Sequence, residues 1–121
     1  MMAIKSQLEM VKQFHQKFRV PVASTPTIIA PDRYDLRHRL MAEEVEEYLA
    51  GAKENNLENI AKELADILYT VYGAILEHGL QDKMTAVFDE VHRSNMTKTF
   101  HEYKIVKGSD FQPADLTEIL N

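Results

Sequence analysis

Two pairs of acidic residues at helical spacing carry the clearest chemical signal in this sequence. Glu63 and Asp66 stand three positions apart, and Asp66 is the one formal charge within the apolar run LADILYTVYGAIL. Glu44 and Glu47 have the same spacing within EEVEE. Residues three apart share one face of a helix, so two helices could present four carboxylates to one another. Carboxylate oxygens are ligands that Mg²⁺ prefers, and we therefore predict a metal site formed by these four side chains.

A structural interpretation of each pair stays open. An acidic run such as EEVEE is typical of a solvated helix face. Asp66 could instead be neutralised by an arginine or a lysine in a core ion pair. The helical phase predicts that Glu44 and Glu47 face the buried side, that Glu46 faces solvent and that Glu43 lies at the border. Because two matched pairs occur, metal binding is the better account of both.

Candidate phosphate ligands lie on two segments. Arg33 and Arg37 fall on the same line of their helix as Glu44, and either could hold a phosphate or simply form a surface ion pair. Asn95 continues an apolar stripe, with Lys98 almost in line at its end. An amide followed by an ammonium suits phosphate oxygens, whereas an asparagine that caps a helix is the alternative.

Four helices are needed to position these residues. Apolar residues at helical spacing predict helices over residues 3–19, 32–55, 57–78 and 82–98. Three prolines make residues 20–31 an irregular connection, and YKIVKG in the tail after residue 98 could form a short strand. The fold predicted is all-α, a single domain over residues 1–121 in which a bundle of four main helices is followed by a short irregular C-terminal tail.

The predicted helix over residues 57–78 is apolar on almost every side. A helix of that kind requires neighbours all round, and one small chain can hardly supply them. We therefore expect a homo-oligomer, a dimer or a tetramer, that completes the core.

Composition excludes several classes. The 121 residues have an apolar content of 45% and a net charge of −5, which argues against a primary role on nucleic acid. There is no cysteine, so neither a disulfide nor a thiolate metal site can form. The apolar run is shorter than the roughly 20 residues that span a bilayer, and no signal peptide is evident. We expect a cytoplasmic protein without a membrane partner.

The acidic residues, with their spacing, resemble the signature of a known group of enzymes. Glu43-Glu44-x-x-Glu47, followed on the next helix by Glu63-x-x-Asp66, is similar to the motif of the all-α nucleoside triphosphate pyrophosphohydrolases. This superfamily contains the MazG-like proteins and phosphoribosyl-ATP pyrophosphohydrolase. The likeness extends from about residue 8 to 116 and includes DILYTVYGAILEHGL and EVHRSNMTK.

The resemblance implies a role for each matching residue. Glu44, Glu47, Glu63 and Asp66 would bind Mg²⁺, or Mn²⁺ in its place. Glu43 would be catalytic, holding a further metal or orienting the attacking water. Asn95 and Lys98 would contact the substrate phosphates, and Arg37 is the further candidate that the residues themselves suggested.

The leading hypothesis is a magnesium-dependent enzyme that hydrolyses (deoxy)nucleoside triphosphates to monophosphate and pyrophosphate, as sanitation of the nucleotide pool. Phosphoribosyl-ATP is the alternative substrate. A non-catalytic helical oligomer that senses metal or nucleotide is an alternative of a different class.

Overall fold

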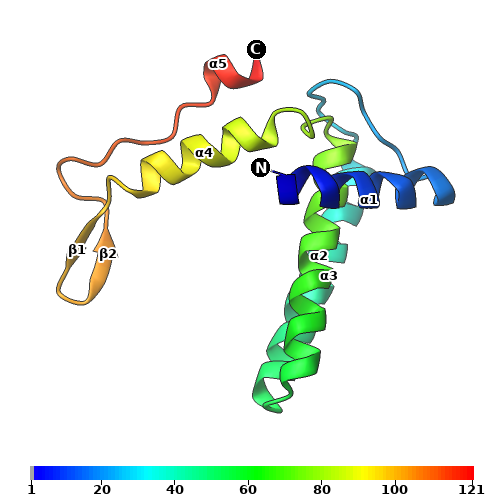
Figure 1. Ribbon diagram of the computed structural model, residues 1–121, viewed down its shortest axis with the longest axis horizontal. Helices are drawn as coiled ribbons and strands as arrows, with labels where there is room; N and C mark the ends of the chain where they lie inside the picture. The colour runs from blue at the N-terminus through cyan, green and yellow to red at the C-terminus, as the bar shows by residue number, and fades with distance from the viewer. Residues whose placement is uncertain (1) are drawn as a thin grey trace. The chain divides into compact units, whose positions relative to one another are not determined.

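The computed structural model describes residues 2–121, with side chains described from Ile4 onward. In this part of the chain there are five helices and one two-stranded antiparallel sheet (Figure 1). Their order is α1 Met2–Phe18, α2 Pro31–Lys53, α3 Leu57–Glu77, α4 Met84–Asn95, β1 Thr99–His101, β2 Lys104–Val106 and α5 Thr117–Leu120. The chain divides into two compact units, one that ends at Gln81 and one over Asp82–Asn121.

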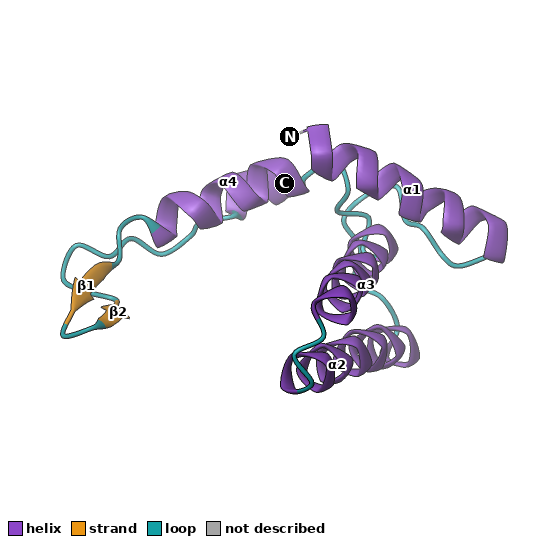
Figure 2. Cartoon of the chain, turned by 60° about the horizontal axis from the view of Figure 1, so that its bottom comes forward, coloured by secondary structure: helices purple, strands orange, loops and turns teal. Residues whose placement is uncertain are grey.

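An antiparallel pair of helices, α2 and α3, forms the centre of the first unit (Figures 1 and 2). Pro31 begins α2, where its fixed φ suits the first turn and its missing N–H is not needed. Asn55 takes a φ of 56° in the turn that follows α2. The side chain of Asn56 then caps α3 by accepting a hydrogen bond from the backbone N–H of Asn59 at 3.1 Å. These two asparagines therefore separate α2 from α3, in agreement with the predicted helices over residues 32–55 and 57–78.

Helix α1 runs across α3 on the side away from α2 (Figure 2). The buried apolar residues of the described chain come from these two helices: Leu8 and Val11 from α1, and Ile75 and Leu76 from α3. Phe14 meets Tyr69 of α3 edge to face, with 5.5 Å between ring centroids. The core of this unit is therefore small.

The connection between α1 and α2 is fastened to the end of α3. Ala23 donates its backbone N–H to the carbonyl of Leu76, and Thr27 donates to that of His78. Gly79 follows α3 with a φ of 65°, and the carbonyl of Thr25 lies where a Cβ would stand. Glycine is required there for both its backbone conformation and its missing side chain. This agrees with the predicted end of the third helix.

The second unit is built on α4. Helix α4 begins at Met84 with Lys83 at its N-cap, so Asp82, the N-terminal residue of the predicted helix, lies instead in the preceding turn. The tail was predicted to be irregular apart from a short strand within YKIVKG. Strand β2 lies within that segment, but the tail is more regular than predicted, because β1 pairs with β2 and a short helix follows. The strands are joined by Glu102 and Tyr103, both with positive φ, which is the twist that a two-residue hairpin turn needs.

The mainly helical prediction is confirmed, with four long helices and a tiny sheet. A self-contained bundle does not describe the first unit, since many large apolar side chains remain exposed there. On α3, Leu64 is 47% exposed and Leu68 is 48% exposed. Completion of the core by a second copy stays a prediction. Among the described residues, no helix combines the length and apolar character needed to cross a membrane.

Candidate metal centre

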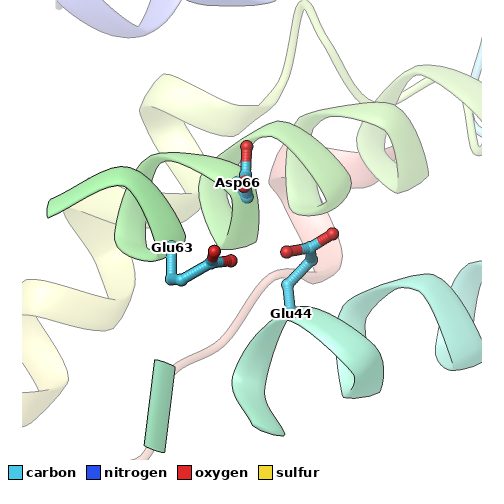
Figure 3. Close-up of side chains that lie close together, drawn as sticks. All are labelled: Glu44, Glu63 and Asp66. Atoms are coloured by element: carbon cyan, nitrogen blue, oxygen red, sulfur yellow. The ribbon is translucent and has the colours of Figure 1, made fainter. Parts of the chain in front are cut away.

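Three of the four predicted metal ligands meet between α2 and α3. Glu44, Glu63 and Asp66 each contribute one carboxylate oxygen to a group whose members lie within 4.8 Å of one another. Figure 3 shows Glu44 on α2 and Glu63 on α3 turned toward each other, with Asp66 beside them. We call these three residues the acidic cluster. Its spacing is suited to a cation held by oxygen ligands from both helices.

The three residues of the acidic cluster are buried to different extents. Glu63 is only 6% exposed, and Glu44 and Asp66 are half-buried. Among the described residues, Oε2 of Glu44 and Oε2 of Glu63 are buried oxygens without a hydrogen-bond partner. A buried carboxylate oxygen without a partner is costly, and a bound cation would satisfy it. The donor set therefore fits a hard divalent cation.

The pKa of Glu44 reflects its burial and the repulsion among the carboxylates around it. Burial, together with the neighbouring carboxylates of Glu63, Glu47 and Asp66, raises the pKa of Glu44 to about 7. Carboxylates that share a site cannot all ionise without a counter-charge. A cation would supply that charge and displace the proton.

The other glutamates of EEVEE are exposed. Glu46 is exposed, as predicted, and so is Glu43. Glu47, predicted on the buried side, is also exposed, although its carboxylate is near enough to raise the pKa of Glu44. Metal binding by Glu47 and a catalytic role for Glu43 stay predictions.

Lys62 is a neighbour of the cluster that the sequence interpretation did not single out. Its Nζ lies 2.7 Å from Oδ2 of Asp66 and 3.6 Å from Oε1 of Glu63. Asp66 raises the pKa of the Lys62 ammonium, and the hydrogen bond between the two side chains is the largest cause. Asp66 is therefore paired with a lysine. Because the Lys62 side chain is 66% exposed, this is a surface ion pair and not a core ion pair. The signal that could have revealed Lys62 is its i, i+4 spacing to Asp66.

Arg37 has protein partners in this structure. Its Nη1 donates to Oε2 of Glu77 at 3.3 Å, and its Nη2 donates to the carbonyl of Thr70 at 2.8 Å. Burial lowers the pKa of Arg37, whereas the hydrogen bonds to Glu77 raise the pKa of Arg33. Gly73 leaves room for Arg37, because a Cβ there would overlap its guanidinium. Arg37 thus links α2 to α3, and substrate binding by this residue stays a prediction.

Sequence interpretation also missed Glu77, which is 2% exposed. The signal for it was a carboxylate directly after the apolar run, with two arginines available on the preceding helix. Buried acids of this kind require a partner, and Arg33 and Arg37 supply it.

Asn95 and Lys98 belong to the second unit. Asn95 is the last residue of α4 and is exposed, and Lys98 is half-buried just before β1. Contact of either residue with substrate phosphates stays a prediction.

A cavity of about 460 Å³ lies among α1, α2 and α3 in the first unit. Its walls include Phe14 and Phe18 of α1 and Tyr69 of α3, and Arg19 and Arg33 also line it. Leu40 and Thr70, which line it too, stand one helical turn from Glu44 and Asp66 respectively. Four residues of helix rise about 6 Å, so these two lining residues lie about 6 Å along the helix axes from the cluster residues.

The comparison with protein families agrees with this site. The model of one family, phosphoribosyl-ATP pyrophosphohydrolase, matches residues 11–95. The chain belongs to this family. No curated protein matches the sequence.

The phosphoribosyl-ATP pyrophosphohydrolase family is part of the MazG-like all-α superfamily, which confirms the resemblance found in the sequence. Its enzymes are pyrophosphohydrolases, hydrolases that act on acid anhydrides. The matched residues include α2, α3 and the whole acidic cluster, and they end at Asn95. The family match therefore falls on the elements that carry the candidate site.

Proposed function

We propose that this protein hydrolyses a nucleoside triphosphate group between its α and β phosphates, releasing pyrophosphate, with Mg²⁺ held by the acidic cluster. The observation that carries the proposal is the convergence of Glu44, Glu63 and Asp66 within 4.8 Å. The family match supports the same class of reaction.

The charge of the site supports a metal-dependent reaction. A polyanionic substrate would be repelled by three carboxylates on a chain whose net charge is −5. A divalent cation, when bound, neutralises charge on the phosphate oxygens and makes water a better nucleophile. Glu44, Glu63 and Asp66 would hold it, and Glu47, one turn after Glu44 on α2, would complete the ligand set. Glu43 would orient the attacking water from the exposed side of α2.

The nucleoside end of the substrate has a suitable place in the cavity beside the cluster. Its volume lies within the range of roughly 300–1,000 Å³ that is usual for small-molecule sites. Aromatic walls such as Phe14 and Tyr69 suit a planar base, and Arg19 adds positive charge. Burial lowers the pKa of His15, which also lines the cavity, and thereby favours the neutral imidazole.

Two substrates share the triphosphate that this site would act on. We propose (deoxy)nucleoside triphosphates as the substrates, in nucleotide-pool sanitation. Phosphoribosyl-ATP is the second candidate, because it names the matching family. The two differ in the phosphoribosyl group beyond the base, so one assay can distinguish them.

The test is a panel of nucleoside triphosphates and phosphoribosyl-ATP, each incubated with Mg²⁺ or Mn²⁺ and scored for pyrophosphate. We expect pyrophosphate and the corresponding monophosphate from at least one substrate, and no turnover in EDTA. Orthophosphate as the first product would show γ-phosphate cleavage and overturn the proposal. Release of no product from any substrate would favour a metal or nucleotide sensor.

Variants of the cluster make this test specific. Glu63→Gln and Glu44→Gln should lower the rate of hydrolysis by about two orders of magnitude or more, because each removes a carboxylate that would bind Mg²⁺. Glu46→Ala is the matched control, since Glu46 lies on the same helix and is exposed. Glu47→Ala should resemble the cluster variants and not Glu46→Ala. Equal losses at Glu46 and Glu47 would contradict the assignment of Glu47.

A further inference from the structure

Lys62 places a positive charge directly on the acidic cluster. Its Nζ lies 2.7 Å from Oδ2 of Asp66 and 3.6 Å from Oε1 of Glu63, so one ammonium pairs with two of the three carboxylates. Lys62 and Asp66 are four residues apart on α3, the spacing at which helical side chains meet. The ammonium therefore lies close to the position that a cation bound by Asp66 and Glu63 would occupy.

This ammonium neutralises the cluster only in part. One positive charge faces three carboxylates, and Oε2 of Glu44 and Oε2 of Glu63 are still without a hydrogen-bond partner among the described residues. Lysine is a compact point charge that can satisfy few oxygens at once. A divalent cation between the two helices could satisfy oxygens that Lys62 does not.

The ammonium and a divalent cation are poor neighbours. Two cations sharing the carboxylates of Asp66 and Glu63 would repel one another, and the repulsion is greater with a divalent ion. The Lys62 side chain is 66% exposed, so its flexible stem can swing into solvent without leaving a cavity in the core. Departure of Lys62 is therefore easy, while its presence opposes metal binding.

We propose that Lys62 is an internal counter-ion of the acidic cluster, which pairs with Asp66 and Glu63 in the metal-free protein and is displaced when Mg²⁺ binds. Lys62 then sets the Mg²⁺ concentration at which the site fills. This inference rests on the proposed metal site. It makes Lys62 a residue that acts on affinity for the metal and not a catalytic residue.

The test measures Mg²⁺ binding directly, by isothermal titration calorimetry without any nucleotide, together with thermal melts in EDTA. Lys62→Gln removes the charge and keeps a helix-forming residue of similar length. Lys62→Arg keeps a charge at this position. Lys53→Gln, at the exposed end of α2, is the matched control for a change in net charge alone.

We expect Lys62→Gln to bind Mg²⁺ about two- to tenfold more tightly than the wild type, since the competing charge is gone. Its melting temperature in EDTA should fall, because three carboxylates then face one another without a counter-charge. Lys62→Arg and Lys53→Gln should bind Mg²⁺ within about twofold of the wild type.

Each contrary result has its own meaning. Weaker or unchanged Mg²⁺ binding by Lys62→Gln, with normal binding by the wild type, would overturn the counter-ion role and leave the metal site intact. Tighter binding by Lys53→Gln to the same extent would also overturn it, because net charge would then explain the effect. A wild type that binds no Mg²⁺ would overturn the metal site and this inference together.

Discussion

Arg33 and Glu77 form a bidentate ion pair that joins the beginning of α2 to the end of α3. Nε of Arg33 donates to Oε1 of Glu77 at 2.9 Å, and Nη2 donates to Oε2 at 2.8 Å. The Glu77 side chain is fully buried, and Arg37 donates to the same Oε2. Parallel hydrogen bonds of this type are among the stronger polar interactions in proteins. This pair holds the two helices that carry the acidic cluster.

We expect Glu77→Gln to destabilise the fold by about 3–5 kcal/mol, because it leaves the buried Arg37 without its carboxylate. The free energy of unfolding from urea denaturation measures this loss. Glu58→Gln is the control, since Glu58 is exposed in the first turn of the same helix, and its effect should stay within about 0.5 kcal/mol. A loss below about 1 kcal/mol for Glu77→Gln would show that the ion pair is not structural.

Asp66→Asn separates a metal ligand from a structural ion pair. In EDTA the free energy of unfolding of the variant should lie within about 1 kcal/mol of that of the wild type, because Lys62, the partner of Asp66, is exposed and remains hydrated without it. In Mg²⁺ the wild type should gain about 2.7 kcal/mol at a hundredfold excess over Kd, and the variant should gain less. Thermal melts of both proteins with EDTA and with Mg²⁺ measure the two effects. A loss of about 3–5 kcal/mol in EDTA would instead identify Asp66 as half of a structural pair.

The attachment of the tail to α4 should depend on pH through Glu90. Hydrogen bonds from Arg93, and then from the backbone N–H of Asp115, lower the pKa of Glu90 to about 2. Because this pKa lies below the ordinary value of 4.5, the ionised carboxylate stabilises the folded form above pH 4.5, and this contribution is lost as the pH falls from 4.5 toward 2.

The amide NMR signal of Asp115 measures this attachment, since that N–H donates to Oε2 of Glu90 at 2.9 Å. It should shift toward its unbonded position as the pH falls through that interval. In Glu90→Gln the shift should be smaller, because only the part that comes from titration of the Asp115 side chain itself remains. A signal of Asp115 that is unchanged between pH 5 and pH 2 in the wild type would contradict the prediction.

The exposed apolar side chains of α3 predict association of the chain with itself. Leu64 and Leu68 are each nearly half exposed, and Tyr69 is 40% exposed. Contiguous apolar surface of this kind is usually covered in solution. We expect a dimer or a larger species at micromolar concentration by light scattering, and a shift toward monomer for Leu64→Lys. A monomeric wild type would contradict this expectation.

The sequence predicted the helices, and the helix faces that carry Glu44, Glu63 and Asp66, because both depend on local periodicity. The apolar repeat determined α2 and α3, and the i, i+3 spacing determined that Glu63 and Asp66 share a face. The exposure of Glu47 escaped prediction, because burial depends on which neighbour covers a helix face and not on the phase of the helix alone.

Features that depend on long-range partners could not be predicted. The contact of Arg37 with Glu77 and the carbonyl of Thr70 requires knowledge of how α2 and α3 align, and Gly73 has meaning only in that alignment. The short strand expected within YKIVKG agrees with β2, but the pairing of β2 with β1 in a hairpin was not predicted. The turn residues of this hairpin, Glu102 and Tyr103, have positive φ but are neither glycine nor asparagine, so the usual sequence signal is missing.

The acidic cluster comes entirely from one helical hairpin, α2 and α3, joined by the short turn at Asn55 and Asn56. Contacts within such a hairpin are close in sequence, so we expect them to form early during folding. The carboxylates would then approach one another before much of the remaining structure can stabilise them. A cation that bridges them would lower the barrier to folding itself, so chelation should slow refolding more than it speeds unfolding.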